Sequence, residues 1–460
     1  MREKAVFSLP KTTKYSSALL YLHDFVLLQQ LAIHRFMRAR DVIKLLECTR
    51  EIEGVPAPTK NAISKRLRRL VAAGVLVLEQ DEDMNLQGLR FNSFFYRLGL
   101  RGFRALEEFT NDDSINPEAA YAATQKLSIP KLHNQAASTL ANEIYMHLLR
   151  LQQENKVSDI PLVLRGGMHE AFKDNRNDSY RVPVQPDYVI DYKNTLIAIE
   201  MDTGNQRGTA NAEKVKQYRN WLNNQPLATH KRLLIIFAVM DESVAPMIVK
   251  DRTRRVVTLR ERTGIQHVEW MNDSRIGVYC ALSIFSKELI GNLIQGISMS
   301  NRLERSFFVS QWFGYLAGCV KSGSMYLETV NKDEYKPFSQ KWDEQWEADE
   351  YMSLKENEKR PKHFFVLYVD TGSSIDYRRI TANIRRVKTI NESDLTNLTI
   401  NLLLVYSSEV ERRFDSIGNL KQLDIPVYST SSEIFNEMYQ RGEQVEHIQD
   451  LPLQLLSRHG

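Results

Sequence analysis

The N-terminal part of the chain has a hydrophobic pattern that predicts helices followed by two short strands. Residues 24–46 alternate apolar and polar positions with the helical period and contain no glycine or proline, which indicates a helical segment. A further helix is expected to start at Thr59, a favourable N-cap residue, and to end at Gly74. The apolar stretches 75–78 and 91–98 predict two strands joined by a polar turn. This order of elements is typical of a winged helix.

The helix predicted between Thr59 and Ala73 is strongly basic. It has no acidic residue, and its five basic residues are Lys60, Lys65, Arg66, Arg68 and Arg69. In a winged helix the corresponding helix fits the DNA major groove, and its cations contact phosphates. We therefore expect these residues to bind DNA. The alternative is a solvated basic face on a module that binds another protein.

The central part of the chain alternates strand-like and helix-like stretches, which predicts an α/β unit. An amphipathic helix is expected at residues 133–153, and residues 186–204 predict a hairpin of two apolar strands. The other expected elements are a strand at 161–164, a basic amphipathic helix at 212–222, a very apolar strand at 233–240, and a helical stretch followed by a strand at 266–270.

The predicted hairpin carries three carboxylates near its ends. Residues two apart in a strand face the same side, so Glu200 and Asp202 are expected to be neighbours. Asp187, on the paired strand, can approach the same space. Such a group repels itself unless a cation neutralises it, and Mg²⁺ or Mn²⁺ takes oxygen ligands and can activate water against a phosphodiester. The alternative is that these carboxylates are hydrated or cap the following helix.

The order of these motifs resembles the PD-(D/E)xK nuclease superfamily and, more closely, the plasmid replication-relaxation family. The matching motifs are Pro186-Asp187, the run Glu200-Met201-Asp202-Thr203-Gly204, and Lys214 with Tyr218. The resemblance extends over roughly residues 20–270. It implies a winged helix followed by a nuclease-like domain, in a protein of a plasmid or integrated mobile element that acts in replication and relaxation of DNA.

The resemblance also implies roles for individual residues. Asp187 and Glu200 would hold the metal, with Asp202 as a further candidate ligand and catalytic residue. Asp202 departs from the superfamily, because it stands where a lysine is usual, and an aspartate cannot steady developing negative charge. Lys214 is the candidate for supplying that charge from the next helix, and Lys216 is a weaker one.

This resemblance also bears on two further residues, Glu143 and Tyr218. Glu143 is a candidate for an outer carboxylate, although a solvated charge is the commoner role for such a helical position. Tyr218 follows Lys214 on the same helical face and is expected to pack or to contact phosphate, not to act as a nucleophile. None of the ten histidines makes the His-apolar-His motif of common strand-transferring relaxases.

A motif of the hairpin recurs in the C-terminal third. Residues 366–372 repeat the apolar strand and the Asp-Thr-Gly of residues 198–204, and an apolar strand follows at a similar spacing. We interpret this as a duplicated domain that has lost its chemistry, with Tyr368 in place of Glu200 and no Pro-Asp. The alternative is coincidence between two α/β units.

The second copy is expected to retain a basic helix. Its candidate DNA-binding residues are Arg378, Arg379, Arg385 and Arg386, together with Lys388. Two nuclease-like folds in tandem would mimic a dimer in which one half cuts and the other grips DNA. The charged stretch before this strand, residues 342–362, resembles a linker, and residues 283–315 are expected to form core or domain-joining helices.

Composition limits the classes of protein that are possible. A chain of 460 residues is expected to hold two to four domains, here placed at 14–110, 130–285 and 286–460. Three widely spaced cysteines argue against a disulfide framework or a zinc ribbon. No apolar run reaches the ~18 residues that span a bilayer, and the N-terminus lacks the apolar centre of a secretory signal. A cytoplasmic protein is expected, and the net charge of +4 does not decide its partners.

These patterns together predict an α/β multi-domain protein: an N-terminal winged helix, a central restriction-endonuclease-like α/β domain and a C-terminal degenerate copy of it. The expected partner is double-stranded DNA, with other replication or conjugation proteins and a homodimer as further candidates. One version of the function nicks or cleaves DNA with Mg²⁺ or Mn²⁺, and another binds an origin or operator without a cofactor. A transcription regulator whose α/β part senses a ligand or builds an oligomer is a third reading. The sequence has no Walker-type phosphate loop, which disfavours nucleotide hydrolysis.

Overall fold

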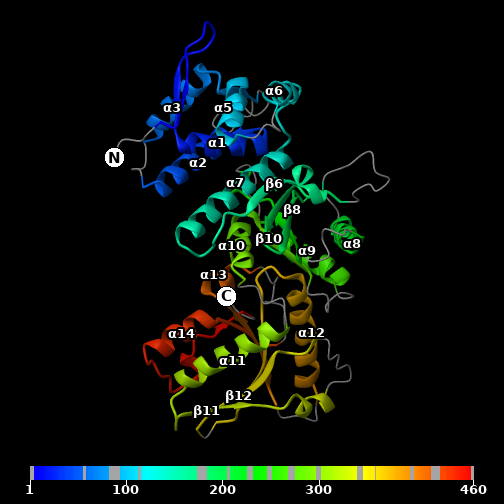
Figure 1. Cartoon of the computed structure of the whole chain (residues 1–460). Helices are drawn as coiled ribbons and strands as arrows, with labels where there is room; N and C mark the ends of the chain where they lie inside the picture. The colour runs from blue at the N-terminus through cyan, green and yellow to red at the C-terminus, as the bar shows by residue number, and fades with distance from the viewer. Residues whose placement is uncertain are drawn as a thin grey trace.

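The computed structural model arranges the chain as three successive regions, N-terminal, central and C-terminal (Figure 1). It describes residues 5–54, 59–81, 94–111, 116–172, 184–204, 208–224, 232–245, 251–267, 275–296, 302–338, 346–357, 359–393, 398–415 and 425–456. None of the described helices is both long and apolar enough to cross a membrane.

The N-terminal region combines helices with a three-stranded antiparallel sheet in the order β3-β5-β4. Its elements are β1 (Phe7–Leu9), β2 (Ala18–Leu20), α1 (Leu22–His34), β3 (Met37–Arg38), α2 (Ala39–Ile52), α3 (Lys60–Ala72), β4 (Leu76–Gln80), β5 (Phe94–Leu98), α5 (Leu100–Thr110) and α6 (Pro117–Gln125). Ile63, Leu67 and Leu70 bury one stripe of α3 against α1 and α2, which leaves the opposite face to solvent.

The ends of α3 are formed as the sequence predicts, whereas the first predicted helix is not continuous. The Thr59 hydroxyl accepts a hydrogen bond from the amide of Ala62, and Gly74 follows the helix with a φ of 72°. The helix expected over residues 24–46 is broken at Arg35, whose φ is 67°, and Met37 begins a strand that pairs with β5. The predicted turn between β4 and β5 lies almost entirely outside the described residues.

The central region is a five-stranded mixed sheet covered by helices on both faces (Figure 1). Along the order β6-β7-β8-β9-β10, the first two pairings are antiparallel and the last two are parallel. Its elements are α7 (Leu132–Gln153), β6 (Leu162–Arg165), β7 (Tyr188–Tyr192), β8 (Thr195–Asp202), α8 (Gly208–Asn224), β9 (Arg232–Val239), α9 (Thr253–His267), β10 (Ile276–Leu282) and α10 (Ser283–Ile294).

The alternation of side chains along β8 explains how helices pack on both faces of the sheet. Ile197, Ile199 and Met201 pack in one core with α7 and α10, while Ala198 packs in a second core with α8 and α9. The strand expected at 266–270 is wrong at residues 266 and 267, because α9 continues to His267. The edge strand after α9 is β10. The expected boundary at residue 285 falls inside α10, which packs on the central core.

The C-terminal region repeats the order of elements and the strand pairing of the central region. In the sheet β11-β12-β13-β14-β15-β16, the first two pairings are antiparallel, the next two are parallel, and β16 adds an antiparallel edge. Its elements are α11 (Arg302–Cys319), β11 (Met325–Thr329), β12 (Glu350–Glu356), β13 (Lys362–Tyr368), α12 (Ser374–Asn391), β14 (Ile400–Tyr406), α13 (Glu409–Phe414), β15 (Val427–Ser431), α14 (Ser432–Gln440) and β16 (Gln454–Leu455). The stretch expected to be a linker therefore contains β12.

A buried polar junction joins the central and C-terminal regions. Arg260 of α9 is fully buried, donates to the carbonyl of Ser373 and pairs with Asp415 at 2.6 Å. The amide of Cys280 in β10 donates to the carbonyl of Gly372, just after β13. Because removing one partner of a buried ion pair is strongly destabilising, these contacts fix the two regions to one another.

Candidate functional site

A cluster of polar side chains lies where β7 and β8 meet the helices α7 and α8. Asp187 directly precedes β7, and Glu200 lies near the end of β8. His133 comes from the first turn of α7, and Lys214 and Tyr218 come from α8. The antiparallel pairing of β7 with β8 brings the two carboxylates together, and the α7 and α8 side chains reach them from the sheet's two faces.

Glu200 is the buried centre of this cluster, with 3% of its surface exposed. Lys214 donates to one carboxylate oxygen at 2.7 Å, and the Tyr218 hydroxyl donates to the other at 2.7 Å. Burial raises the pKa of Glu200, Lys214 opposes this shift, and the nearby charge of Asp187 adds to it. Lys214 and Tyr218 reach the same carboxylate because residues four apart share one face of a helix.

Asp187 is held between the backbone of β8 and α7. One of its carboxylate oxygens accepts from the Met201 amide at 2.8 Å, and the other lies 2.9 Å from Nε2 of His133. This hydrogen bond raises the pKa of His133, although burial opposes the shift. Sequence reasoning missed His133, because only the fold brings it to a carboxylate 54 residues away.

Asp202 takes part in a different interaction from the one expected. Its carboxylate accepts from Nε and a terminal nitrogen of Arg255 in α9, at 2.6 and 3.0 Å. Asp202 does lie on the same face of β8 as Glu200, as predicted, but its bidentate ion pair with Arg255 connects β8 to α9. Among the described residues, no group of three or more His, Cys, Asp or Glu side chains is arranged to hold a metal ion. The expected three-carboxylate site is therefore not assembled, and Asp202 is better explained as structural.

A smaller donor set does fit a magnesium-like ion. Mg²⁺ usually keeps several waters and is held by one or two carboxylates together with phosphate oxygens. Asp187 and Glu200 supply two carboxylates close enough for the charge of one to shift the pKa of the other. They are the only two of the three predicted ligands that the structure places in this cluster.

The other residues predicted near this site lie elsewhere or are inaccessible. Glu143 forms an ion pair with Lys44 of α2, so it joins the N-terminal and central regions. Lys216 is exposed on α8 and pairs with Glu213. Tyr218 has none of its surface exposed and donates its proton to Glu200, and burial followed by the charge of Glu200 raises its pKa well above its usual range. In this arrangement the Tyr218 hydroxyl serves as a hydrogen-bond donor to Glu200.

The basic helix α3 presents most of its predicted cations to solvent. Those exposed are Lys60, Lys65, Arg68 and Arg69, and none of them pairs with another residue in the described part of the chain. Arg66 differs, because it forms an ion pair with the fully buried Asp24 and donates to the carbonyl of Leu19. Arg66 thus holds α3 to α1, and four of the five predicted DNA-binding residues remain available.

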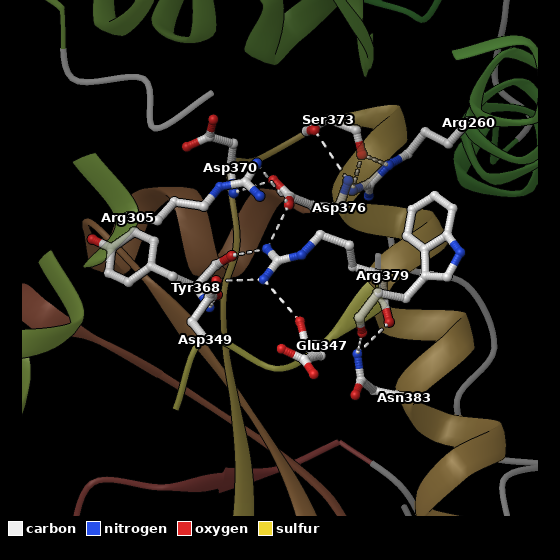
Figure 2. A network of polar contacts seen from close by, with 11 residues as sticks. Arg260, Arg305, Glu347, Asp349, Tyr368, Asp370, Ser373, Asp376, Arg379 and Asn383 are labelled. Carbon is white, nitrogen blue, oxygen red and sulfur yellow. Dashed lines mark hydrogen bonds and ion pairs between the residues drawn. The ribbon is translucent and has the colours of Figure 1, made fainter. Parts of the chain in front are cut away.

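The predicted basic helix of the C-terminal region corresponds to α12, and it is mostly not a basic surface. Arg379 and Arg386 are buried, at 4% and 5% exposure. Arg379 pairs with Asp349 and Asp376, and Arg386 donates to the carbonyl of Trp346 (Arg379 and Asp376 in Figure 2). The expectation that these two arginines contact DNA is therefore corrected.

The remaining cations of α12 are more accessible. Arg385 is exposed, and Arg378 is half-buried with its guanidinium above the ring of Trp346. Lys388, also half-buried, lies 3.6 Å from Glu392 one helical turn later. The basic composition that suggested a DNA-binding face thus arises partly from Arg379, which pairs with the carboxylates of Asp349 and Asp376.

A shared backbone contact defines how the two α/β regions correspond. In the central region the carboxylate of Asp187 accepts from the amide of Met201 at 2.8 Å, and in the C-terminal region that of Asp349 accepts from the amide of Tyr368 at 2.7 Å. Each aspartate directly precedes the second strand of its sheet. Asp349 is therefore the counterpart of Asp187, in a stretch where no such aspartate was expected.

This correspondence shifts the expected alignment of the two motifs by one residue. Tyr368 packs in the core beside α11 and α14, whereas Leu367 packs beside α12, the counterpart of α8. Leu367 and not Tyr368 thus stands in the position of Glu200, because a shift of one residue moves a strand's side chain to the opposite face. The glutamate is absent from the second copy, as predicted, but its replacement was misassigned.

The position of the candidate site in the C-terminal region is filled by an ion-pair network (Figure 2). The oxygen of Asp349 that does not accept from Tyr368 pairs with Arg379, which also pairs with Asp376 at 3.0 Å. Arg305 of α11 lies 3.1 Å from the same Asp376 carboxylate. The counterpart of the His133–Asp187 contact has thus become a buried structural link between helices and sheet.

Comparison with known proteins identifies the part of the chain that contains the candidate site. Residues 28–233 match the family model described as replication-relaxation, from α1 to the start of β9. No curated protein and no solved structure shows a significant match to the chain. The matched segment contains α3 and all the residues of the Asp187–Glu200 cluster, so the part of the chain that is similar to the replication-relaxation family also carries the candidate site.

Proposed function

We propose that the chain is a DNA-binding protein that acts in replication or relaxation of plasmid or other mobile-element DNA, with a nuclease-like central region. The family match supports this setting. DNA binding is supported by the N-terminal order α1, β3, α2, α3, β4, β5, which is that of a winged helix, and by the exposed cations of α3.

The nuclease-like assignment rests on both topology and site. The succession α7-β6-β7-β8-α8-β9 places an aspartate before the second strand and a glutamate on the third, which is the arrangement expected from the resemblance to PD-(D/E)xK nucleases. The repeated succession α11-β11-β12-β13-α12-β14 supports a second, degenerate copy of this domain.

The observation that carries the enzymatic reading is the contact of Lys214 with the buried Glu200 at 2.7 Å. A buried ionisable group with a shifted pKa beside a charged partner is typical of functional sites. Asp187 and Glu200 would hold Mg²⁺ or Mn²⁺, which when bound supplies activation of water and polarisation of the phosphodiester. Lys214, placed by α8, would stabilise the negative charge that develops on the phosphate. His133 would act as a positioning residue through Asp187.

A non-catalytic reading is favoured by one specific observation. Every carboxylate oxygen of Asp187 and Glu200 already accepts a hydrogen bond from the protein. A chain that uses the nuclease-like fold only to bind an origin or an operator has no need to release these contacts. The two readings make different predictions for the dependence of activity on Glu200.

The deciding experiment is incubation of supercoiled plasmid with the full chain and Mg²⁺ or Mn²⁺. Wild type is compared with Asp187→Asn, Glu200→Gln and Lys214→Met, and with Glu213→Gln, which changes an exposed carboxylate on α8, as a control. For an enzyme we expect the three site variants to lose about 100-fold or more of nicking, and the control to retain it. Nicking that is equal in all variants, or absent while DNA binding is intact, would leave the non-catalytic reading.

A further inference from the structure

A cavity lies between the N-terminal and central regions, next to the candidate site. Its volume is about 410 Å³, and its lining includes the end of α1, residues 126–131 before α7, and the facing ends of β6 and β7. Asp187 and Tyr188 belong to this lining, so the cavity opens beside one of the two candidate metal ligands.

The lining of this cavity is rich in positive charge. Arg35, Lys126, Lys131 and Arg165 all line it, whereas Asp187 is its one acidic residue. None of these four side chains forms an ion pair or hydrogen bond with another residue in the described ranges. The charge of Arg165 also contributes to lowering the pKa of Arg35, after burial, so these two cations repel each other. Unpaired like charges around one space favour an anionic occupant.

A buried histidine adds a hydrogen-bonding group to the same wall. His34 is 4% exposed, and its Nδ1 lies 2.7 Å from the hydroxyl of Tyr188. Its Nε2 is buried and has no hydrogen-bond partner in the described structure. Burial and then Arg165 lower the pKa of His34 to about 3, so the ring is neutral near pH 7. When the Tyr188 hydroxyl donates to Nδ1, Nε2 carries the hydrogen and has no acceptor in the described structure.

The backbone at this wall is strained. Arg35 follows the end of α1 with a φ of 67° and a ψ of −42°, a backbone conformation that residues other than glycine rarely adopt. Such strain persists where the surrounding structure imposes it, and it is concentrated at functional positions. Here it turns the chain so that Arg35 reaches the cavity wall beside His34.

We propose that this cavity is a phosphate-binding subsite. Phosphate combines the negative charge that the four cations favour with the acceptor oxygens that His34 and the arginines can donate to. The inference deepens the proposed function: a DNA phosphate seated here would position the neighbouring phosphodiester at Asp187 and Glu200. The same chemistry would accept a free nucleotide, so the two sources are separated by experiment.

The test measures binding of two probes to the full chain, a short labelled DNA duplex by fluorescence anisotropy and dAMP by the shift of the thermal unfolding midpoint. The double variant Arg35→Asn/Arg165→Gln removes two lining charges, and asparagine tolerates a positive φ. Arg441→Gln, at an exposed arginine directly after α14, is the matched control. We expect the double variant to lose about tenfold or more in affinity for at least one probe and the control to lose none. For DNA, the dependence on salt should also weaken by about one to two phosphate contacts.

The outcomes separate this inference from the proposed nuclease activity. Loss of DNA affinity alone identifies the DNA strand as the source of the phosphate, and loss of the dAMP shift alone identifies a nucleotide. Either result supports the subsite even when no plasmid is nicked. Unchanged binding of both probes by the double variant overturns it, even when wild type nicks plasmid. Lys126→Gln/Lys131→Gln, at two exposed positions, repeats the test if the first variant unfolds.

Discussion

Replacement of Arg379 by methionine tests the structural role that its burial indicates. Arg379 is 4% exposed and lies between the carboxylates of Asp349 and Asp376, and it also donates to the carbonyl of Tyr368 (Figure 2). Methionine retains much of the length of the side chain but removes its charge and donors. The substitution therefore leaves two buried carboxylates with fewer partners without opening a large cavity.

The expected cost follows from the type of interaction that is lost. Removing one partner of a buried ion pair destabilises a protein by about 3–5 kcal/mol, because the other charge remains buried and uncompensated. Arg305 still contacts Asp376, so the lower part of this range is expected. Arg385→Met, on the exposed face of the same helix, should change stability by no more than about 0.5 kcal/mol.

The dependence on pH gives a second measurement. Burial would raise the pKa of Asp376, but Arg305 and Arg379 outweigh it and hold this pKa below its usual value. A carboxylate with a lowered pKa in the folded state contributes stability above its unfolded pKa and loses it as the pH falls through the folded value. The destabilisation by Arg379→Met should therefore be largest near neutral pH and shrink in acid.

Urea unfolding of both variants, followed by circular dichroism at pH 7 and at about pH 3, below the usual pKa of an aspartate, measures these differences. A destabilisation by Arg379→Met of less than about 1 kcal/mol, similar to that of Arg385→Met, would contradict the reasoning. Weaker DNA binding at unchanged stability would restore the role in DNA contact that the sequence suggested for Arg379.

Three further predictions concern the site, the strained turn and α3. Tyr218→Phe removes a donor to the buried Glu200, so it should lower the free energy of unfolding by about 1–3 kcal/mol at pH 8. The pKa of Glu200 is already raised and will rise further in this variant, so the loss of stability should shrink toward pH 5. Unfolding curves at the two pH values measure this difference. Arg35→Gly should raise the stability by about 1–2 kcal/mol in thermal unfolding, and an unchanged or lower midpoint would argue against strain. Lys65→Gln/Arg68→Gln should leave the fold intact but lower DNA affinity and its dependence on salt by about two contacts, as anisotropy titrations at several salt concentrations would reveal.

Features set by neighbouring residues could be predicted from the sequence. The cap at Thr59, the end of α3 at Gly74 and the hairpin that carries Glu200 depend on local propensity and alternation. The break at Arg35 could not be predicted, because no glycine or proline marks it. It arises where the chain leaves α1 to pair Met37 with β5.

Features set by distant contacts were missed for physical reasons. His133 reaches Asp187 only because α7 packs on the central sheet, and the ion pair of Asp202 requires Arg255 from α9. An arginine on an amphipathic helix gives the same sequence signal whether it faces solvent or a buried carboxylate, so Arg379 could not be told from Arg385. Lys214 could be predicted as a site residue because it lies four residues before Tyr218 on the same helix, and this local spacing places both side chains at Glu200.

The loss of Glu200's counterpart in the second copy has a consequence for stoichiometry. Leu367 stands at that position, and Arg379 pairs with Asp349, so the described residues of the C-terminal region do not form a second candidate site. A single centre meets one strand of a duplex at a time. Under the proposed nuclease function, one chain is therefore expected to cut one strand of a circle in each binding event, which gives a nicked and still-connected circle.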